Sequence, residues 1–124
     1  MSRVIKFRAW DGDEITNEFS LYSDGKIASR VGTFSPKPLI LMQFTGLYDL
    51  HGKEIYEKDR IRYGAIDADG NTHEMKGTIE WDSEECGFVV ESDSDKWPII
   101  AMRFVIQKEI IGNAYETPDL ISSK

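Results

Sequence analysis

Residues 59–81 read DRIRYGAIDADGNTHEMKGTIEW, and this stretch decides the fold class. Polar and apolar residues alternate in 59–66 and again in 73–81, and a period of two is typical of half-buried β-strands. Between these runs, Asp69-Gly70 supplies the backbone conformations of a tight hairpin turn. The stretch therefore predicts a β-hairpin.

The chain that follows this hairpin continues the same pattern. CGFVVES (86–92) is predicted to be a third strand, joined to the second by the acidic turn DSEE. WPIIAMRFVIQKEIIG (97–112) is too long for one strand, so it should break or bend, and a partly helical conformation of 97–111 stays open. Thr117 as N-cap with Pro118 at the first helical position predicts a short terminal helical turn.

The N-terminal third also indicates strands. VIKFRAW (4–10) alternates between a largely basic and an apolar face, and FSLYSDGKIAS (19–29) reads as a hairpin around Asp24-Gly25. PLILMQFTG (38–46) is a continuous apolar run, which favours a strand buried on both faces over a short helix. We expect a mainly β chain, a small barrel or sandwich with at most one or two short helices.

Composition and charge narrow the function classes. The chain has 124 residues, a single cysteine and a net charge of −7, so no disulfide can form within it and a reducing cytoplasm is expected. No apolar run approaches the ~18 residues of a membrane helix, and we see no secretory leader. Between residues 82 and 95 there are six acids and no base, which should repel nucleic acid. These acids are either solvated turn residues or an acidic face for a basic partner.

No catalytic or metal-binding motif stands out. His51, His73 and Cys86 lack the spacing of a zinc site, so the histidines are expected at the surface and Cys86 as a small buried side chain. DADGN (67–71) resembles the start of a calcium loop, but the positions that should hold glycine and glutamate hold threonine. We expect neither an enzyme nor a cofactor or metal site.

Two short segments, 3–10 and 60–63, combine cations with an aromatic residue. Aromatics interleaved with positive charge are typical of surfaces that bind single-stranded nucleic acid. Core packing with ordinary exposed cations is the simpler account, and the small nucleic-acid-binding module is the alternative. The cations of that alternative are Arg3, Lys6, Arg8, Arg60 and Arg62.

Three segments stand out together: KFRAWD (6–11), FTGLYDLHGKEIYEKD (44–59) and IIGNAYETPDL (110–120). In this order and spacing they resemble the YopX family of small phage and prophage proteins. Lys58 stands where the family pattern usually has glycine. The residues that carry the motif are Trp10, Gly46, Leu47, Gly52, Ile55, Tyr56, Asp59, Gly112, Asn113 and Tyr115.

The resemblance implies a β-rich protein made in a bacterial cytoplasm from phage-derived DNA, with no established activity or cofactor. We expect one domain over residues 1–124, with N-terminal strands in 1–48 and a barrel-like part from about 55 to 124. An acid before an alternating strand, as at Asp59, is also how many SH3-like barrels begin. The first hypothesis is a non-enzymatic accessory protein that works through protein–protein contacts, with homo-oligomerisation as one form of these contacts.

Overall fold

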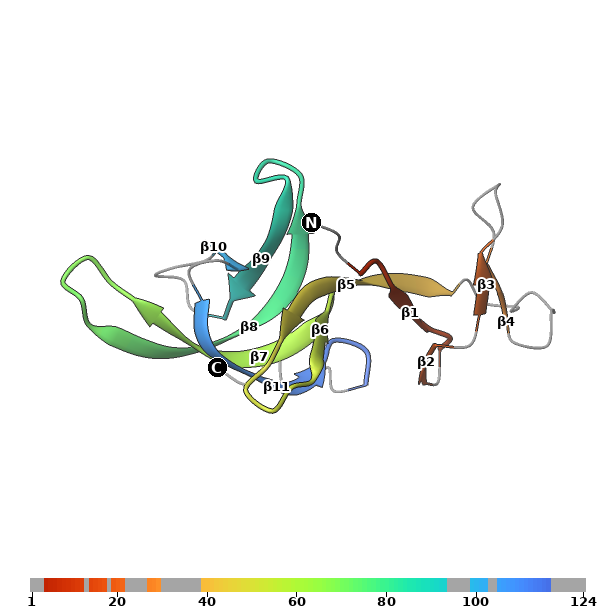
Figure 1. Ribbon diagram of the computed structural model, residues 1–124, viewed down its shortest axis with the longest axis horizontal. Helices are drawn as coiled ribbons and strands as arrows, with labels where there is room; N and C mark the ends of the chain where they lie inside the picture. Colours follow the sequence, from red (N-terminus) through yellow and green to blue (C-terminus); the bar gives the residue numbers. More distant parts are fainter. Residues whose placement is uncertain are drawn as a thin grey trace.

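The computed structural model of the chain is built almost entirely from β-strands (Figure 1). Its described residues contain no α-helix, which confirms the predicted fold class. A helix that could cross a membrane is likewise not found in this part of the chain. The structure describes residues 4–12, 14–17, 19–21, 27–29, 39–93, 99–102 and 105–116.

The first sheet has four strands in the order β2-β1-β5-β6. They are β1 (Phe7–Trp10), β2 (Ile15–Thr16), β5 (Ile40–Tyr48) and β6 (Glu54–Tyr56). The apolar run within 38–46 forms a strand as expected, but the prediction that both of its faces are buried is wrong. Only Met42 and Phe44 of β5 are buried, and Ile40 is 40% exposed, because β5 faces a core on one side only.

A separate two-stranded ladder joins β3 (Phe19–Leu21) to β4 (Ile27–Ser29). The register pairs Phe19 with Ser29 and Leu21 with Ile27. The pairing confirms the hairpin predicted for 19–29. Its expected turn at Asp24-Gly25 lies outside the described residues.

The second sheet has five strands in the order β10-β9-β8-β7-β11 and curls on itself (Figure 1). Its turns lie where the sequence places them: the Asp67 carbonyl accepts from the Gly70 N–H at 3.0 Å, and an acidic turn joins β8 to β9. The final long apolar segment breaks as predicted, and its residues 99–101 and 105–112 lie in two separate strands. The strands are β7 (Asp59–Ile66), β8 (Thr72–Asp82), β9 (Gly87–Ser92), β10 (Ile99–Ala101) and β11 (Val105–Asn113).

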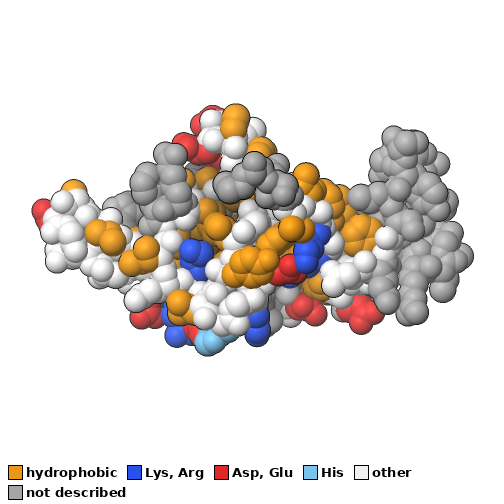
Figure 2. Space-filling view, viewed as in Figure 1, with side chains coloured by type: hydrophobic (Ala, Val, Ile, Leu, Met, Phe, Trp, Pro, Cys, Tyr) orange, Lys and Arg blue, Asp and Glu red, His pale blue; other side chains and the backbone are white. Residues whose placement is uncertain are grey.

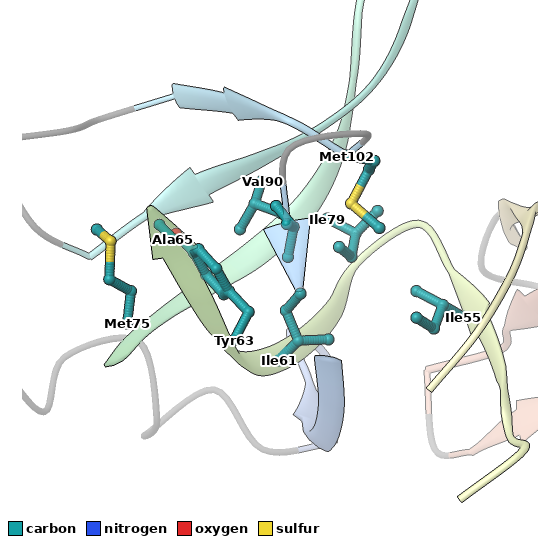
Figure 3. Packing of buried hydrophobic residues seen from close by; sticks show 9 residues of the cluster. Ile55, Ile61, Tyr63, Ala65, Met75, Ile79, Val90 and Met102 are labelled. Carbon is teal, nitrogen blue, oxygen red and sulfur yellow. The ribbon is translucent and has the colours of Figure 1, made fainter. Parts of the chain in front are cut away.

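The core lies on one face of the curled sheet (Figure 3). Ile61, Tyr63 and Ala65 alternate along β7 and point into it, as the period-two pattern requires. Ile55 belongs to β6 of the first sheet, yet it is completely buried in this same core. The expected boundary between residues 48 and 55 therefore falls at a strand that hydrogen-bonds to one sheet and packs against the other.

Two predictions from the sequence concern other parts of the chain. The short helical turn expected at Thr117 and Pro118 lies outside the described residues. The prediction that Cys86 is buried is wrong, because this residue is exposed. It occupies the turn between β8 and β9 with a φ of 53°, so its side chain is held away from the core.

Candidate functional site

The three sequence segments that carry the family resemblance contact one another in space. Arg8 of the first segment bonds Asp59 of the second, and the Trp10 ring stacks on Tyr115 of the third at 5.6 Å between centroids. The Lys58 carbonyl of the second segment accepts from the Ala114 N–H of the third at 2.8 Å. We call this arrangement the clasp, since it ties β1, the β5–β7 connection and the end of β11 together.

Asp59 is the most deeply buried acid of the clasp, with 1% exposure. One carboxylate oxygen accepts from Arg8 Nη2 at 2.7 Å, and the other accepts from the Tyr56 N–H at 2.8 Å. Burial raises the pKa of Asp59, while the Arg8 charge and the Tyr56 N–H act in the opposite direction. The Arg8 guanidinium also lies 4.7 Å from the centre of the Tyr56 ring. These contacts join the two sheets and leave Asp59 no access to a substrate.

The end of β11 is closed by Asn113, which is 8% exposed. Its side-chain oxygen accepts from the N–H groups of Tyr115 and Glu116 at 3.0 and 2.8 Å. Its amide nitrogen donates to Glu116 Oε1 at 2.7 Å. Asn113 thus forms the turn that carries the Tyr115 ring onto Trp10, so its role in the motif is structural.

The backbone conformation at Lys58 accounts for the glycine that the family pattern usually has at this position. Its φ is 71°, a conformation that costs a residue with a side chain roughly 1–2 kcal/mol relative to glycine. The Lys58 N–H donates to the Ile79 carbonyl at 2.8 Å, so the backbone is held on both sides. The side chain pairs with Glu80. The chain therefore keeps the positive φ at this position with a lysine, although glycine adopts this conformation most easily.

This strain yields a testable prediction for two variants of Lys58. Both Lys58→Gly and Lys58→Ala remove the ion pair with Glu80, so their difference isolates the backbone conformation. We expect Lys58→Gly to be more stable than Lys58→Ala by about 1 kcal/mol, after the greater freedom of glycine in the unfolded chain is subtracted. Urea unfolding followed by circular dichroism measures the difference. An alanine variant as stable as the glycine variant would contradict the assignment of strain.

In the turn after β5, the polar side chain of Asp49 is buried and its apolar neighbours are exposed, which is the reverse of the usual arrangement. It is only 7% exposed, whereas its neighbours Tyr48 and Leu50 are 53% and 63% exposed. One Asp49 oxygen accepts from the His51 and Lys53 N–H groups at 2.8 and 3.0 Å. The polar side chain therefore points inward at this turn while large apolar side chains point outward.

The same aspartate fastens the turn to an edge of the second sheet. Its other oxygen accepts from the Ile110 N–H at 3.1 Å, and the Leu50 N–H donates to the Lys108 carbonyl at 2.8 Å. Burial favours the neutral acid, but the Lys53, Ile110 and His51 N–H groups outweigh it and lower the pKa of Asp49. Gly46 and Gly52, with φ values of 87° and 80°, allow the chain to enter and leave this turn.

A groove of about 500 Å³ begins beside Leu50 and runs over β7, β8 and β11. Its polar walls are already paired: Arg62 lies 3.5 Å from Glu109 and 4.0 Å from Glu74. His51 Nε2 lies 3.0 Å from the second oxygen of Glu109. These pairs leave no nucleophile beside a free base among the described lining residues.

The candidate cations do not gather on one surface. Arg60 is fully buried and forms a bidentate pair with Asp93 at 2.8 and 2.5 Å. Arg8 is mostly buried against Asp59. The expectation that both arginines belong to an exposed cationic face is therefore wrong, because each neutralises an acid inside the fold. Of the other candidates, Lys6 pairs with Glu54 and Arg62 lies in the groove, while Arg3 is not among the described residues.

The histidines lie near the surface, as expected. The His51 and His73 side chains are 59% and 40% exposed, and His73 Nε2 lies 2.7 Å from Asp67. No group of three metal-ligating side chains comes together within the residues that the structure describes. The Asp67 carboxylate instead accepts from the Asp69 and Asn71 N–H groups, both at 2.9 Å, which makes 67–71 a hydrogen-bonded turn.

The sequence missed the inward-pointing Asp49 and the outward-pointing Tyr48 and Leu50. The segment DLHGK reads as an ordinary turn, in which an aspartate is normally exposed. The one available signal is that apolar residues flank the aspartate on both sides. The partner that turns Asp49 inward is Ile110, sixty-one positions along the chain, and this contact depends on the folded sheet.

Comparisons with known proteins agree with the fold, and the family match includes the second and third segments of the clasp. A family model described as YopX protein matches residues 16–122. The crystal structure of protein EF1440 from Enterococcus faecalis is similar with a TM-score of 0.64 and 23% sequence identity, covering 97% of this chain and 99% of that chain. The search of curated proteins gave no match. At this level of identity the likeness to EF1440 concerns the fold alone.

Proposed function

We propose that this chain, which belongs to the YopX family, acts by binding another protein and not by catalysing a reaction. The observation that supports this is the inverted burial around Asp49. We define the 47–50 ridge as the exposed side chains of Leu47, Tyr48 and Leu50, which are 37%, 53% and 63% exposed. Large apolar side chains exposed on one short segment, whose backbone is held by hydrogen bonds, are a feature of protein contact sites.

The ridge is rigid before any partner arrives. Asp49 accepts three backbone hydrogen bonds, and the Leu50 N–H is bonded to the Lys108 carbonyl. A contact surface that is already ordered loses less conformational entropy on binding. The groove beside Leu50 offers a partner side chain a place to enter, with charged groups along its walls. The ridge and the groove together form the proposed contact surface.

The setting that we propose follows from the family resemblance. The chain would be an accessory protein encoded by phage or prophage DNA and made in the bacterial cytoplasm. Its partner is a host or phage protein, or a second copy of the chain in a homo-oligomer. A partner that covers the ridge would remove these apolar side chains from water, worth roughly 25 cal/mol for each Å² of apolar surface.

The experiment compares two variants with matched exposure. Leu50→Ser removes a ridge residue, and Ile5→Ser removes an apolar side chain that is 61% exposed elsewhere on the chain. Truncation of a central contact residue typically costs 2 kcal/mol or more, so we expect Leu50→Ser to weaken the contact about thirtyfold or more. Ile5→Ser should bind like the original chain.

Two measurements read out this contact. Affinity capture from a bacterial lysate with quantitative mass spectrometry detects a different partner protein, and light scattering detects self-association. Loss of the captured protein or of the oligomer with Leu50→Ser alone supports the proposal. A monomer that reproducibly captures nothing, or an equal loss with both variants, would refute it.

The alternative is a nucleic-acid-binding module, and its candidate cations now give it less support. Lys6, Arg8, Arg60 and Arg62 each lie beside a carboxylate. Cations that are already paired displace few counterions from a phosphate backbone. We expect no gel shift with single- or double-stranded DNA or RNA at low salt. A salt-sensitive shift would favour this alternative over protein binding.

A further inference from the structure

The hairpin of β8 and β9 carries a second surface, away from the 47–50 ridge. Its tip lies at the top of Figure 1, whereas the turn that holds the ridge lies at the bottom. Acidic side chains gather at this tip in Figure 2. We propose that the tip is a docking site for a lysine- or arginine-rich segment of a partner protein. This inference extends the proposed binding role to a new surface, and either surface can be refuted without the other.

The aromatic part of the surface is Trp81, which is 52% exposed. It pairs directly across the ladder with Phe88, and the two rings meet edge to face with centroids 5.3 Å apart. Phe88 is packed against the main core cluster. Trp81 is therefore held in place by Phe88, and about half of its surface stays exposed, where a positively charged side chain can reach the ring.

A small pocket of about 180 Å³ lies beside the Phe88 ring. Phe88, Ala101 and Met102 give it apolar walls, and Glu85 adds a carboxylate. Lysine and arginine have long aliphatic stems that bury readily while the charged end stays near a polar group. The combination of apolar walls and one acid fits this kind of side chain better than an uncharged or an acidic one.

Within the part of the chain that the structure describes, no cation pairs with the two acids at the end of the hairpin. The Asp82 carboxylate turns back to accept from the Glu84 and Glu85 N–H groups at 2.8 and 3.1 Å. These bonds hold the turn in shape and direct the next two acids outward. Among the described residues, Glu84 and Glu85 have no ion-pair partner, whereas Glu80 on the same hairpin pairs with Lys58. The tip thus keeps a negative charge that repels phosphate and attracts a basic segment.

The test uses the full chain and a fluorescein-labelled peptide of alternating lysine and serine residues. Fluorescence anisotropy gives the affinity, and amide chemical shifts of the ¹⁵N-labelled chain locate the peptide. We expect shifts at residues 81–88 and 101–102. Glu85→Gln should weaken binding about tenfold, as for the loss of a charged hydrogen bond. Trp81→Ala should weaken it about threefold, as for the loss of an exposed cation–π contact.

The matched control is Glu74→Gln, which removes the same charge from an exposed side chain of β8 outside the pocket. It should leave the affinity nearly unchanged, and so should Leu50→Ser on the ridge. Both Trp81 and Glu85 are exposed, so their variants should fold, and thermal unfolding followed by circular dichroism checks this. Absence of binding, or equal weakening by Glu74→Gln and Glu85→Gln, would overturn the proposal. Shifts at the ridge in place of the hairpin would overturn it as well.

Discussion

Replacing Asp93 with alanine is expected to lower the free energy of unfolding by about 3 kcal/mol, because it leaves the buried Arg60 guanidinium without its bidentate partner. The Arg60 side chain is completely buried, and its two nitrogens lie 2.8 and 2.5 Å from the Asp93 oxygens. A buried charge that loses its counter-ion keeps the cost of desolvation and loses the compensating attraction. The bond from Arg60 Nη1 to Thr78 Oγ1, at 3.0 Å, involves a neutral acceptor and offsets only part of this loss.

A double-mutant cycle separates the pair from the packing around it. Arg60→Met with Asp93→Ala should be more stable than Asp93→Ala alone, because the buried charge is removed together with its carboxylate partner. The control is the exposed pair Arg62 and Glu74, 4.0 Å apart, for which the corresponding variants should change stability by less than about 0.5 kcal/mol. Urea unfolding followed by circular dichroism measures all of them. If Asp93→Ala cost no more than Glu74→Ala, the buried pair would not stabilise the fold as argued.

Arg60 also shows where inference from sequence reaches its limit. The alternation in DRIRYGAI predicts the strand correctly, and it makes both Arg60 and Arg62 candidates for a solvent-facing position. Only Arg62 is exposed. Asp93 lies thirty-three positions from Arg60 and reaches it only because β8 and β9 fold back beside β7. The alternation of polar and apolar residues along the sequence predicts the strand, whereas a long-range ion pair depends on the assembled sheet.

The hairpins were easier to predict than the surfaces. A tight turn has a local sequence requirement, so Asp69-Gly70 and the acidic turn before Cys86 marked two connections of the second sheet. The family motif lies in three separate segments, and the clasp supplies the reason, since Arg8 contacts Asp59 and Trp10 contacts Tyr115 only in the folded chain. For the exposed ridge the sequence holds only the apolar residues that flank Asp49, because this side chain turns inward to bond the distant Ile110.

Gly77→Ala should lower the free energy of unfolding by about 3 kcal/mol. The cause is a steric clash of the added methyl group, since Gly77 does not have the positive φ that favours glycine. A Cβ atom at this position would lie 2.5 Å from Val90 Cγ1 and 2.6 Å from the Glu91 carbonyl oxygen. Because the second contact is with backbone, β9 would have to move away from β8, and overpacking of this kind costs 1–3 kcal/mol and occasionally more.

Gly64→Ala is the control: its nearest contact is the Ile106 side chain at 2.9 Å, which can rotate, so a loss of about 1 kcal/mol is expected. Urea unfolding compares the two variants, and equal losses would contradict the tight approach of β8 and β9. Because Trp81 and Phe88 pair across these same strands, Gly77→Ala should also weaken lysine-peptide binding in whatever fraction of the protein still folds.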